Sequence, residues 1–339
     1  MARHRIGIVG LGMALKPHAL ALRDLADRVE VGAAFAPSAA RRDEAARAWG
    51  LPVVDSLDRL LDDHSIDAVL ILTPPWTHAG LVARAAAAGK HVLLEKPVDV
   101  GAERAAGIVA ACERAGVRLG VVLQHRFRPA ALELARMVRA GRLGRLLSAS
   151  ASIRWWRSAE YFAQAGRGTL ARDGGGVLLT QAIHTLDLLL QLTGPAAEVM
   201  AYADTSPLRR IDTEDIVAAC VRYASGASGV IDATTVAFPG YAERIEIAGT
   251  LGSAVLEVET LTVECVDGER VRLDGPAAGG GGADPMAFSH AHHRRLLAEF
   301  LDAIDAGREP SNSGRSALDV QRLIDGLLAS AKRCGPVTV

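Results

Sequence analysis

Residues 5–15 read Arg-Ile-Gly-Ile-Val-Gly-Leu-Gly-Met-Ala-Leu, an apolar run that ends in two glycines one residue apart. Such a run, followed by helical spacing, predicts a buried β-strand that enters a helix through a tight turn. Gly10 would permit the turn, and Gly12 would let a pyrophosphate approach the backbone beside Met13 and Ala14 at the helix N-terminus. This turn is the candidate dinucleotide site, although the third glycine of the usual fingerprint is replaced by Leu15.

The strand–helix alternation that begins here continues to residue 125. Strands are predicted at residues 5–9, 29–35, 68–72, 91–94 and 118–123, and helices at residues 15–25, 39–49, 77–88 and 102–115. Gly50, Gly89 and Gly116 stand just past three of the helices, where a left-handed residue ends a helix. Alternation of this kind predicts an α/β Rossmann domain over residues 1–125 and makes an ordinary strand–helix turn at Gly10 the weaker interpretation.

After residue 125 the regular alternation of strands and helices ends. Helices are predicted at residues 129–140, 177–192, 290–306 and 316–331, and strands at 146–156, 214–223, 229–235, 244–248, 254–258 and 261–266, with a glycine-rich loop at 279–282. Successive strands joined by turns are typical of an open, largely antiparallel sheet. We therefore expect an α+β domain over residues 126–339, for substrate binding and oligomerisation, with closing helices able to pack back on the first domain.

The composition narrows the class of protein. The 339 residues carry 38 basic and 39 acidic side chains, a net charge of −1, which argues against nucleic acid or an anionic membrane as the main partner. No apolar run reaches the length of a membrane span, and the glycine-punctuated N-terminus is a poor secretory signal. Four scattered cysteines without a CxxC pair predict reduced thiols in a cytoplasmic protein, and no metal site is predicted.

The residues after the second strand bear on the choice of cofactor. An acid that would bind the adenosine ribose is absent, and Ala36 stands in its place. Ser38 can cap the next helix, and Arg41 and Arg42 add positive charge one turn in. This combination favours the 2′-phosphate of NADP over NAD, while the alternative is a capped surface helix with solvated arginines.

Other candidate residues follow the later strands of the first domain, where ligands bind in open α/β sheets. Only four lysines occur in the chain, so Lys96 at such a strand end is notable, because an ammonium can transfer a proton and a guanidinium cannot. The remaining candidates for cofactor binding are Thr73, Pro74, Trp76, His78, Glu95 and Gln124.

A second group of candidate residues begins at Gly174-Gly-Gly176 and continues into the helix predicted at residues 177–192. Thr180, His184 and Asp187 share one helical face at spacings of four and three, with Gln181 beside them. A histidine on an apolar helix is more often a satisfied core residue, but three polar groups on one face favour the wall of a binding site.

Taken together, Gly10-Leu-Gly12, Thr73-Pro74, Glu95-Lys96-Pro97 and Gly174-Gly-Gly176 leading to His184 and Asp187 resemble the Gfo/Idh/MocA family across essentially the whole chain. The resemblance implies NAD(P)-dependent oxidation or reduction at a hydroxyl-bearing carbon of a sugar or cyclitol. It assigns Lys96 and His184 to the reacting oxygen. Many relatives have an Asp where Thr180 stands, so Asp187 or Gln181 is left to orient the histidine ring.

The resemblance also implies a substrate-side strand and loop at Arg154, Trp156 and Arg167, which would join Lys96, Thr180, Gln181 and His184 in binding a sugar-like substrate. Aromatic faces stack on sugar rings and arginines bind anionic groups. Packing between subunits explains Arg154 and Trp156 equally well, since a homodimer or homotetramer is expected. A non-catalytic cofactor-binding sensor and a reductase of another substrate class are the competing functions.

Overall fold

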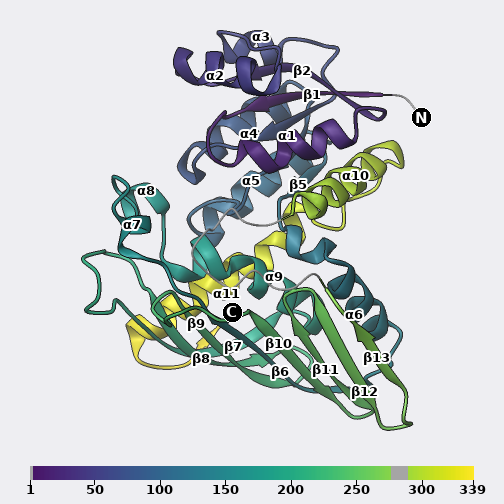
Figure 1. Ribbon diagram of the computed structural model, residues 1–339, viewed down its shortest axis with the longest axis vertical. Helices are drawn as coiled ribbons and strands as arrows, with labels where there is room; N and C mark the ends of the chain where they lie inside the picture. Colours follow the sequence, from purple (N-terminus) through teal and green to yellow (C-terminus); the bar gives the residue numbers. More distant parts are fainter. Residues whose placement is uncertain (1–2, 276–288) are drawn as a thin grey trace. The chain divides into compact units, whose positions relative to one another are not determined.

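The computed structural model describes residues 3–275 and 289–339, so the loop expected at residues 279–282 lies outside the described residues. The described chain forms two compact units (Figure 1). Unit 1 comprises the residues up to Gln124 together with residues 289–318, and unit 2 comprises the rest. The functional boundary expected between residues 125 and 126 stays a prediction.

Unit 1 contains a five-stranded parallel sheet in the order β2-β1-β3-β4-β5. Its strands are β1 (His4–Val9), β2 (Val29–Phe35), β3 (Ala68–Ile71), β4 (His91–Leu94) and β5 (Leu119–Val121). A single parallel bridge between Ala34 and Val53 continues the sheet beyond β2. The chain leaves β1 towards β2 on one side and returns to β3 on the other. This reversal is the topological switch point of the sheet. In open α/β sheets, ligands bind at the switch point, outside the carboxyl ends of the strands.

The helices of unit 1 are α1 (Leu15–Asp24), α2 (Ala39–Trp49), α3 (Leu57–Leu61), η1 (Pro75–Thr77), α4 (His78–Ala87), α5 (Ala102–Arg114) and α10 (Ala291–Asp305). The predicted alternation is confirmed, and α3 is an addition that Ser56 caps through the Asp58 N–H. Gly50, Gly89 and Gly116 have the positive φ angles expected at helix ends. Helix α10 packs against α1.

Unit 2 contains a nine-stranded sheet in the order β13-β12-β11-β10-β6-β9-β8-β7-β14. Its strands are β6 (Leu146–Arg154), β7 (Ala196–Asp204), β8 (Ile216–Tyr223), β9 (Ser228–Thr234), β10 (Arg244–Gly249), β11 (Gly252–Glu257), β12 (Thr260–Cys265), β13 (Arg270–Leu273) and β14 (Val337–Thr338). Every paired strand of this sheet is antiparallel except β6 with β9, which confirms the predicted sheet. Strands β7, β13 and β14 were not predicted.

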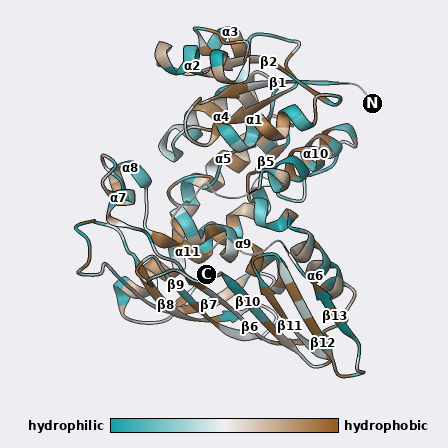
Figure 2. Cartoon of the chain, viewed as in Figure 1, coloured by the Kyte–Doolittle hydropathy of each residue, from teal (hydrophilic) through white to brown (hydrophobic). Residues whose placement is uncertain are grey.

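Helices cover one face of this sheet. Helix α9 (Ile183–Thr193) packs on β6, and α6 (Pro129–Arg139) packs on α9 and on β11 and β12. The shorter helices of this part of the chain are η2 (Gln124–Phe127), α7 (Ala159–Phe162) and α8 (Leu170–Asp173). Figure 2 shows hydrophobic and hydrophilic sides on α10 and on α11 (Gly314–Arg333). In β8 the side chains of Val217, Ala219 and Val221 are buried, whereas Ile216 and Cys220 are exposed. Strand alternation therefore leaves the second face of the sheet uncovered by helices of unit 2.

The long helix predicted at residues 177–192 is interrupted. Residues Leu178–Ala182 form a π-helical turn, η3, before α9 begins at Ile183. A π turn inserts an extra residue and changes which side chains share a face, and such turns are frequent at functional sites. Thr180 therefore does not continue the face of α9 at regular α-helical spacing.

Candidate active site

The glycine turn after β1 has the geometry that a dinucleotide requires. Gly10 has φ +102°, and a Cβ there would lie 2.8 Å from the Leu72 carbonyl carbon, so a side chain is excluded. At Gly12 the nearest atom to a Cβ is a guanidinium nitrogen of Arg41 at 3.9 Å, so the backbone faces open space. Among the described residues no side chain caps α1, whose N-cap residue is Ala14. Its first N–H groups and dipole favour an anion.

An open cavity of about 360 Å³ lies beside this turn. Three of the predicted cofactor residues, Gly12, Met13 and Arg41, line it together with Lys16 and Trp49, which the sequence analysis did not assign to the cofactor. Two cations beside an uncapped helix N-terminus form a site suited to phosphate groups.

Ser38 and Arg42 serve the turn between β2 and α2. The Ser38 hydroxyl accepts the Arg41 N–H at 3.4 Å, the expected cap. Arg42 donates from Nη1 to the carbonyls of Ala36 at 2.7 Å and Pro37 at 3.0 Å. Arg42 is therefore bonded to the backbone and does not line the cavity beside Gly12, whereas Arg41 does.

The turn after β3 is held by its own side chains. Thr77 donates from Oγ1 to the Thr73 hydroxyl at 2.7 Å and lies equally close to the Pro74 carbonyl. His78 is fully buried, with its ring nitrogens 2.8 Å from the Thr73 carbonyl and 3.0 Å from the Val98 carbonyl. Burial lowers the pKa of His78. The buried His78 ring thus holds the turn through its contacts with these two carbonyls. Trp76, on the same turn, is about half exposed.

Glu95, immediately before Lys96, belongs to a buried cluster with two histidines. His18 Nε2 lies 2.8 Å from Glu95 Oε1, and the rings of His18 and His293 meet edge to face at 4.9 Å. Although burial opposes it, the hydrogen bond from His18 holds the pKa of Glu95 below its usual range. Glu95 Oε2 accepts the Lys96 N–H at 3.1 Å, which ties the Lys96 backbone to this cluster.

Among the described residues of unit 1, this cluster is the group whose donor atoms lie close enough together to hold a metal ion. The ligand atoms of His18, Glu95 and His293 lie within 4.8 Å of one another. The short contact between His18 and Glu95 is a hydrogen bond, however, and a metal ion would have to displace its proton. The geometry therefore favours a hydrogen-bonded cluster.

Gln124 completes the candidate cofactor residues of unit 1. Its side chain is buried at the first residue of η2, and its Oε1 has no hydrogen-bond partner among residues 3–275 and 289–339. A buried amide oxygen without a donor is costly unless a ligand or water supplies one. Together with the open space beside the Gly12 backbone and the uncapped N-terminus of α1, this amide oxygen means that the residues at the site are suited to bind a dinucleotide.

In unit 2, Glu214 holds the glycine-rich start of η3. Its carboxylate accepts the N–H groups of Gly176 and Leu178, each at 3.1 Å, and so caps the helix. Burial raises the pKa of Glu214, and these backbone hydrogen bonds oppose that effect. A Cβ at Gly176 would stand 2.0 Å from the Glu214 carbonyl oxygen, which explains the glycine.

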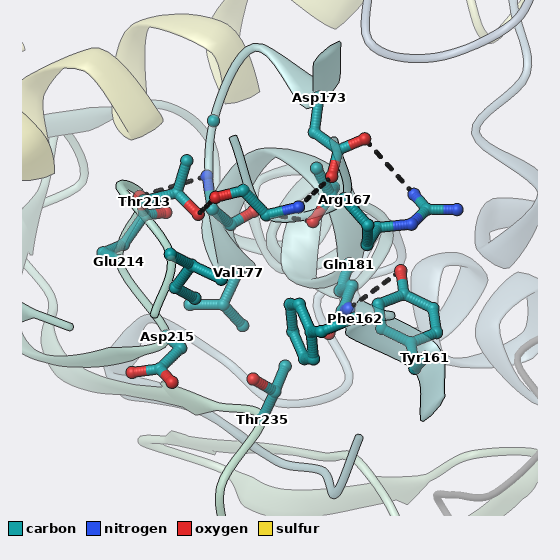
Figure 3. A pocket seen from close by; sticks show the side chains of 15 residues that line it. Tyr161, Phe162, Arg167, Asp173, Val177, Gln181, Thr213, Glu214, Asp215 and Thr235 are labelled. Atoms are coloured by element: carbon teal, nitrogen blue, oxygen red, sulfur yellow. Dashed lines mark hydrogen bonds and ion pairs between the residues drawn. The ribbon is translucent and has the colours of Figure 1, made fainter. Parts of the chain in front are cut away.

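Thr180, Gln181 and Arg167 line one small cavity of about 10 Å³, room for about one water molecule (Figure 3). Gln181 donates from Nε2 to the Tyr161 hydroxyl at 3.3 Å, and its buried Oε1 has no partner in the described part of the chain. Arg167 faces Asp173 at 3.4 Å and stacks on Tyr161 at 4.8 Å. Thr180 donates to the Gly176 carbonyl at 2.7 Å.

His184 is buried on the first turn of α9, and Asp187 is bonded elsewhere. Arg126 binds both oxygens of Asp187, with Nε 2.6 Å from Oδ2. Burial raises the pKa of the Asp187 carboxyl, and the Arg126 guanidinium works in the opposite direction. Both Asp187 oxygens are therefore engaged by Arg126, and the ring against His184 is that of His125, 4.8 Å away between centroids.

Arg154 lies apart from this group, whereas the Arg209 guanidinium lies over both the Trp156 ring, at 5.6 Å, and the Phe162 ring that lines the cavity, at 4.4 Å. Arg154 follows the strand alternation onto the face of the sheet opposite α9, where it pairs with Asp232 at 2.8 Å. Trp156 forms an edge contact with Phe238 at 5.5 Å. The placement of Arg154 favours subunit packing over substrate binding, because period-two alternation separates it from Thr180 and His184.

Sequence reasoning did not find several residues that the structure brings to these sites. His18, His125, Glu214 and Glu243 are distant in sequence from the residues they hold, and no spacing rule links them. Only Glu214 had a local signal, because a run of three glycines before a helix implies close approach by another group.

Comparisons with known proteins agree with this geometry. Residues 4–123 match a family model described as an oxidoreductase family with an NAD-binding Rossmann fold, and residues 131–255 match the GFO/IDH/MocA C-terminal domain. The rhizopine catabolism protein MocA of Rhizobium meliloti is 32% identical over 75% of this chain and 78% of its own length. Inositol 2-dehydrogenase of Rhizobium meliloti (strain 1021) is 28% identical over 96% of each chain.

Two solved structures are similar over essentially the whole chain. Levoglucosan dehydrogenase in complex with NADH has a TM-score of 0.88 at 26% identity, covering 100% of this chain and 99% of its own. The WlbA dehydrogenase of Bordetella pertussis, in complex with NADH and UDP-GlcNAcA, has a TM-score of 0.85 at 29% identity with the same coverage. Fold and site thus define an oxidoreductase with an NAD-binding Rossmann domain. The chain belongs to the GFO/IDH/MocA family.

Proposed function

We propose that this protein transfers a hydride to or from the hydroxyl or keto carbon of a sugar, a sugar derivative or a cyclitol, with NAD(P) as cofactor. The observation that carries the proposal is the combination in one chain of the dinucleotide turn at Gly10–Gly12, Lys96 at the end of β4, and His184 in a polar group on α9. The names of the relatives support it, since they include dehydrogenases of inositol and of levoglucosan.

Each candidate residue has a part in this proposal. The turn at Gly10, Gly12, Met13 and Ala14 would hold the pyrophosphate, with the Thr73–Pro74 turn, Trp76, Glu95 and Gln124 as further cofactor contacts, and His78 as support for the turn. The cofactor, when bound, supplies or accepts the hydride. Lys96 and His184 would hold or move the proton at the reacting oxygen of the substrate. Arg167, Thr180, Gln181 and Trp156 would contact the rest of the substrate.

NADP is the proposed preference over NAD. Ala36 leaves no carboxylate to repel a 2′-phosphate, and Arg41 lines the cavity beside Gly12 with Lys16. Arg42 contributes to the positive field of the turn although its Nη1 is bonded to carbonyls. The similar solved structures contain NADH, so this preference would distinguish the chain from them.

A homodimer or homotetramer in the cytoplasm is also proposed. The uncovered face of the sheet in unit 2 carries exposed apolar side chains, among them Met200, Tyr202 and Val230, which a second copy would cover. The four cysteines are unpaired as thiols, which fits a reducing compartment. No described helix is both long and apolar enough to span a membrane.

The experiment that tests the function is an activity screen with the purified protein. Inositols, aldoses, anhydrosugars and sugar acids would be offered with NADP+ or NAD+, and the corresponding ketones with the reduced cofactors, while absorbance at 340 nm reports hydride transfer. The expected result is turnover of at least one such compound that is lost in Lys96→Ala. Tight cofactor binding without turnover of any compound would instead support the sensor function.

A further inference from the structure

His184 lies against a second histidine that the proposed mechanism does not use. His125, on η2, stacks on His184 with ring centroids 4.8 Å apart and planes inclined by 30°. Both side chains are buried, with residue exposures of 7% and 8%. The two rings form a close, tilted pair, so the position of one ring limits the orientation of the other.

The His125 ring is itself fixed on two sides. Arg128 Nη2 lies 2.7 Å from His125 Nε2, and because a guanidinium nitrogen can only donate, Nε2 must accept. The ring proton therefore belongs on Nδ1, which faces Glu243 Oε1 at 3.3 Å. The contact with Arg128 thus favours the tautomer with the proton on Nδ1, and Glu243 lies at ion-pair distance from that nitrogen without hydrogen-bond geometry.

Glu243 links this arrangement to the helix that carries His184. Its carboxylate is buried, is ion-paired with Arg128, and accepts the hydroxyl of Thr185 at 2.9 Å. Thr185 follows His184 directly in α9. One carboxylate therefore holds both the ring that stacks on His184 and the helical turn from which His184 projects. We call His125, Arg128 and Glu243 the His125 clamp.

A strained residue anchors the clamp. Val258, in the turn between β11 and β12, has φ +52°, which is unfavourable for a β-branched side chain. Its N–H donates to the Glu243 carbonyl at 3.1 Å, and its own carbonyl accepts from Arg128 Nη1 at 3.2 Å. Strain of this kind persists where the surrounding contacts fix the backbone, and it is often found at functional sites.

We propose that His125 is a positioning residue for His184 and does the orienting work of the carboxylate that Thr180 replaces. The Thr180 hydroxyl donates to the Gly176 carbonyl, and both oxygens of Asp187 are bound by Arg126. His125 holds the ring by stacking, and the clamp supplies the rigidity. This role rests on the proposed function of His184, since it acts through that residue.

The kinetic test uses His125→Ala, His125→Phe and Glu243→Gln, with Glu246→Gln as the matched control. Glu246 lies on β10 near Glu243 but is exposed and paired with Arg244. We expect His125→Ala to lower kcat about 10-fold, the scale of a slightly misplaced group, with KM changed less than about 2-fold. His125→Phe should restore most of kcat because it keeps the stack, and the control should match the wild type. Equal losses in His125→Ala and His125→Phe would overturn the stacking role.

A second readout needs no substrate and separates this inference from the proposed function. In protein labelled on histidine with ¹⁵N and ¹³C, NMR reports the tautomer of each ring, and His184→Gln identifies the His184 signals. We expect the His125 proton on Nδ1, and displaced His184 signals in Glu243→Gln and His125→Ala. A His125 proton on Nε2, or unchanged His184 signals in both variants, would overturn the clamp. Full turnover in His184→Ala would instead reject the catalytic role of His184, whatever the NMR result.

If His125→Ala does not fold, the kinetic and NMR measurements are made on His125→Phe and Glu243→Gln instead.

Discussion

At the scale of single residues, the proposed chemistry rests on two side chains, Lys96 and His184, whose neighbours are different. Lys96 has its backbone N–H tied to Glu95, which His18 holds in turn. His184 is stacked on His125 inside unit 2. The rigid surroundings of each residue are what a proton-transfer group needs, because small misplacements reduce its contribution.

Removing either group tests that assignment directly. Lys96→Ala and His184→Ala should each fold and still bind NADP(H), and each should lose about 10²-fold or more in turnover, the usual contribution of a positioned acid–base group. Steady-state rates and cofactor titration measure both effects. Lys332→Ala, in the last turn of α11, is the control and should retain full activity. Near-normal turnover in Lys96→Ala contradicts the catalytic assignment.

Arg41 provides the residue-scale test of cofactor choice. We expect NADP(H) to bind more tightly than NAD(H), and Arg41→Ala to narrow that difference by about 1–3 kcal/mol, the scale of a charged hydrogen bond. Fluorescence titration of both cofactors measures it. Arg47→Ala, at the other end of α2, should leave the difference unchanged. Tighter binding of NAD(H) to the wild type contradicts the prediction.

His293 should make the protein sensitive to acid. Burial lowers the pKa of His293 from 6.5 to about 3, so between these values the unfolded chain binds a proton that the folded chain does not. Stability should then fall as the pH decreases from about 6.5 towards 3, by at most about 1.4 kcal/mol per pH unit from this residue. Urea unfolding of His293→Leu should show a shallower pH dependence than the wild type. An identical slope in both proteins contradicts the assignment.

At the scale of elements, the capping of a helix N-terminus determines whether its backbone N–H groups are available to a ligand. Helix α1 begins without a side-chain cap and leaves its N–H groups for a ligand, whereas η3 is capped by Glu214. The first arrangement suits binding of an anion, and the second fixes Thr180 and Gln181 in place. The same backbone chemistry therefore serves binding in one unit and rigidity in the other.

Gly176 tests the packed start of η3. A Cβ there would stand 2.0 Å from the Glu214 carbonyl oxygen, so Gly176→Ala should lower the free energy of unfolding by about 2 kcal/mol or more. Gly107 in α5 has nothing within 4 Å of its Cβ position, and Gly107→Ala should leave stability unchanged or raise it by about 0.5–1 kcal/mol. Thermal and urea unfolding compare the two variants. Equal free energies of unfolding for Gly176→Ala and Gly107→Ala would contradict the prediction and show that Glu214 can shift to make room for the Cβ.

At the scale of the whole molecule, the sheet face of unit 2 that its own helices leave uncovered leads to the prediction that a second copy of the chain covers it. Exposed apolar residues on β7, β8 and β9 include Tyr202, Ile216 and Val230. Light scattering at micromolar concentration should give a multiple of the 35.6 kDa chain mass. Val230→Glu should reduce the mass towards one chain, and Val266→Glu, in the exposed turn after β12, should not. A wild-type mass near 35.6 kDa refutes the oligomer.

The sequence by itself determined the layered architecture and the residue types of the site. Glycine turns, strand–helix alternation and later successive strands act over a few residues, so the order of β1–β5 with their helices, and the antiparallel character of the second sheet, followed from local pattern. Strand β7 was missed because its exposed positions, such as Met200 and Tyr202, are apolar like its buried ones and hide the alternation, whereas β13 and β14 have only four and two residues. The predicted residues Gly12, Met13 and Arg41 do line one cavity, and Thr180, Gln181 and Arg167 line another.

Only the tertiary structure decided which side chains hold those residues. Strand alternation moved Arg154 to the opposite face from His184, and the π turn changed the register of Thr180. Asp187 is bound by Arg126, and His125 takes its place beside His184. These contacts join residues tens of positions apart, and they form because buried charges and rings must find partners in the folded chain. No local pattern encodes that pairing, because the partners become neighbours only when the chain folds.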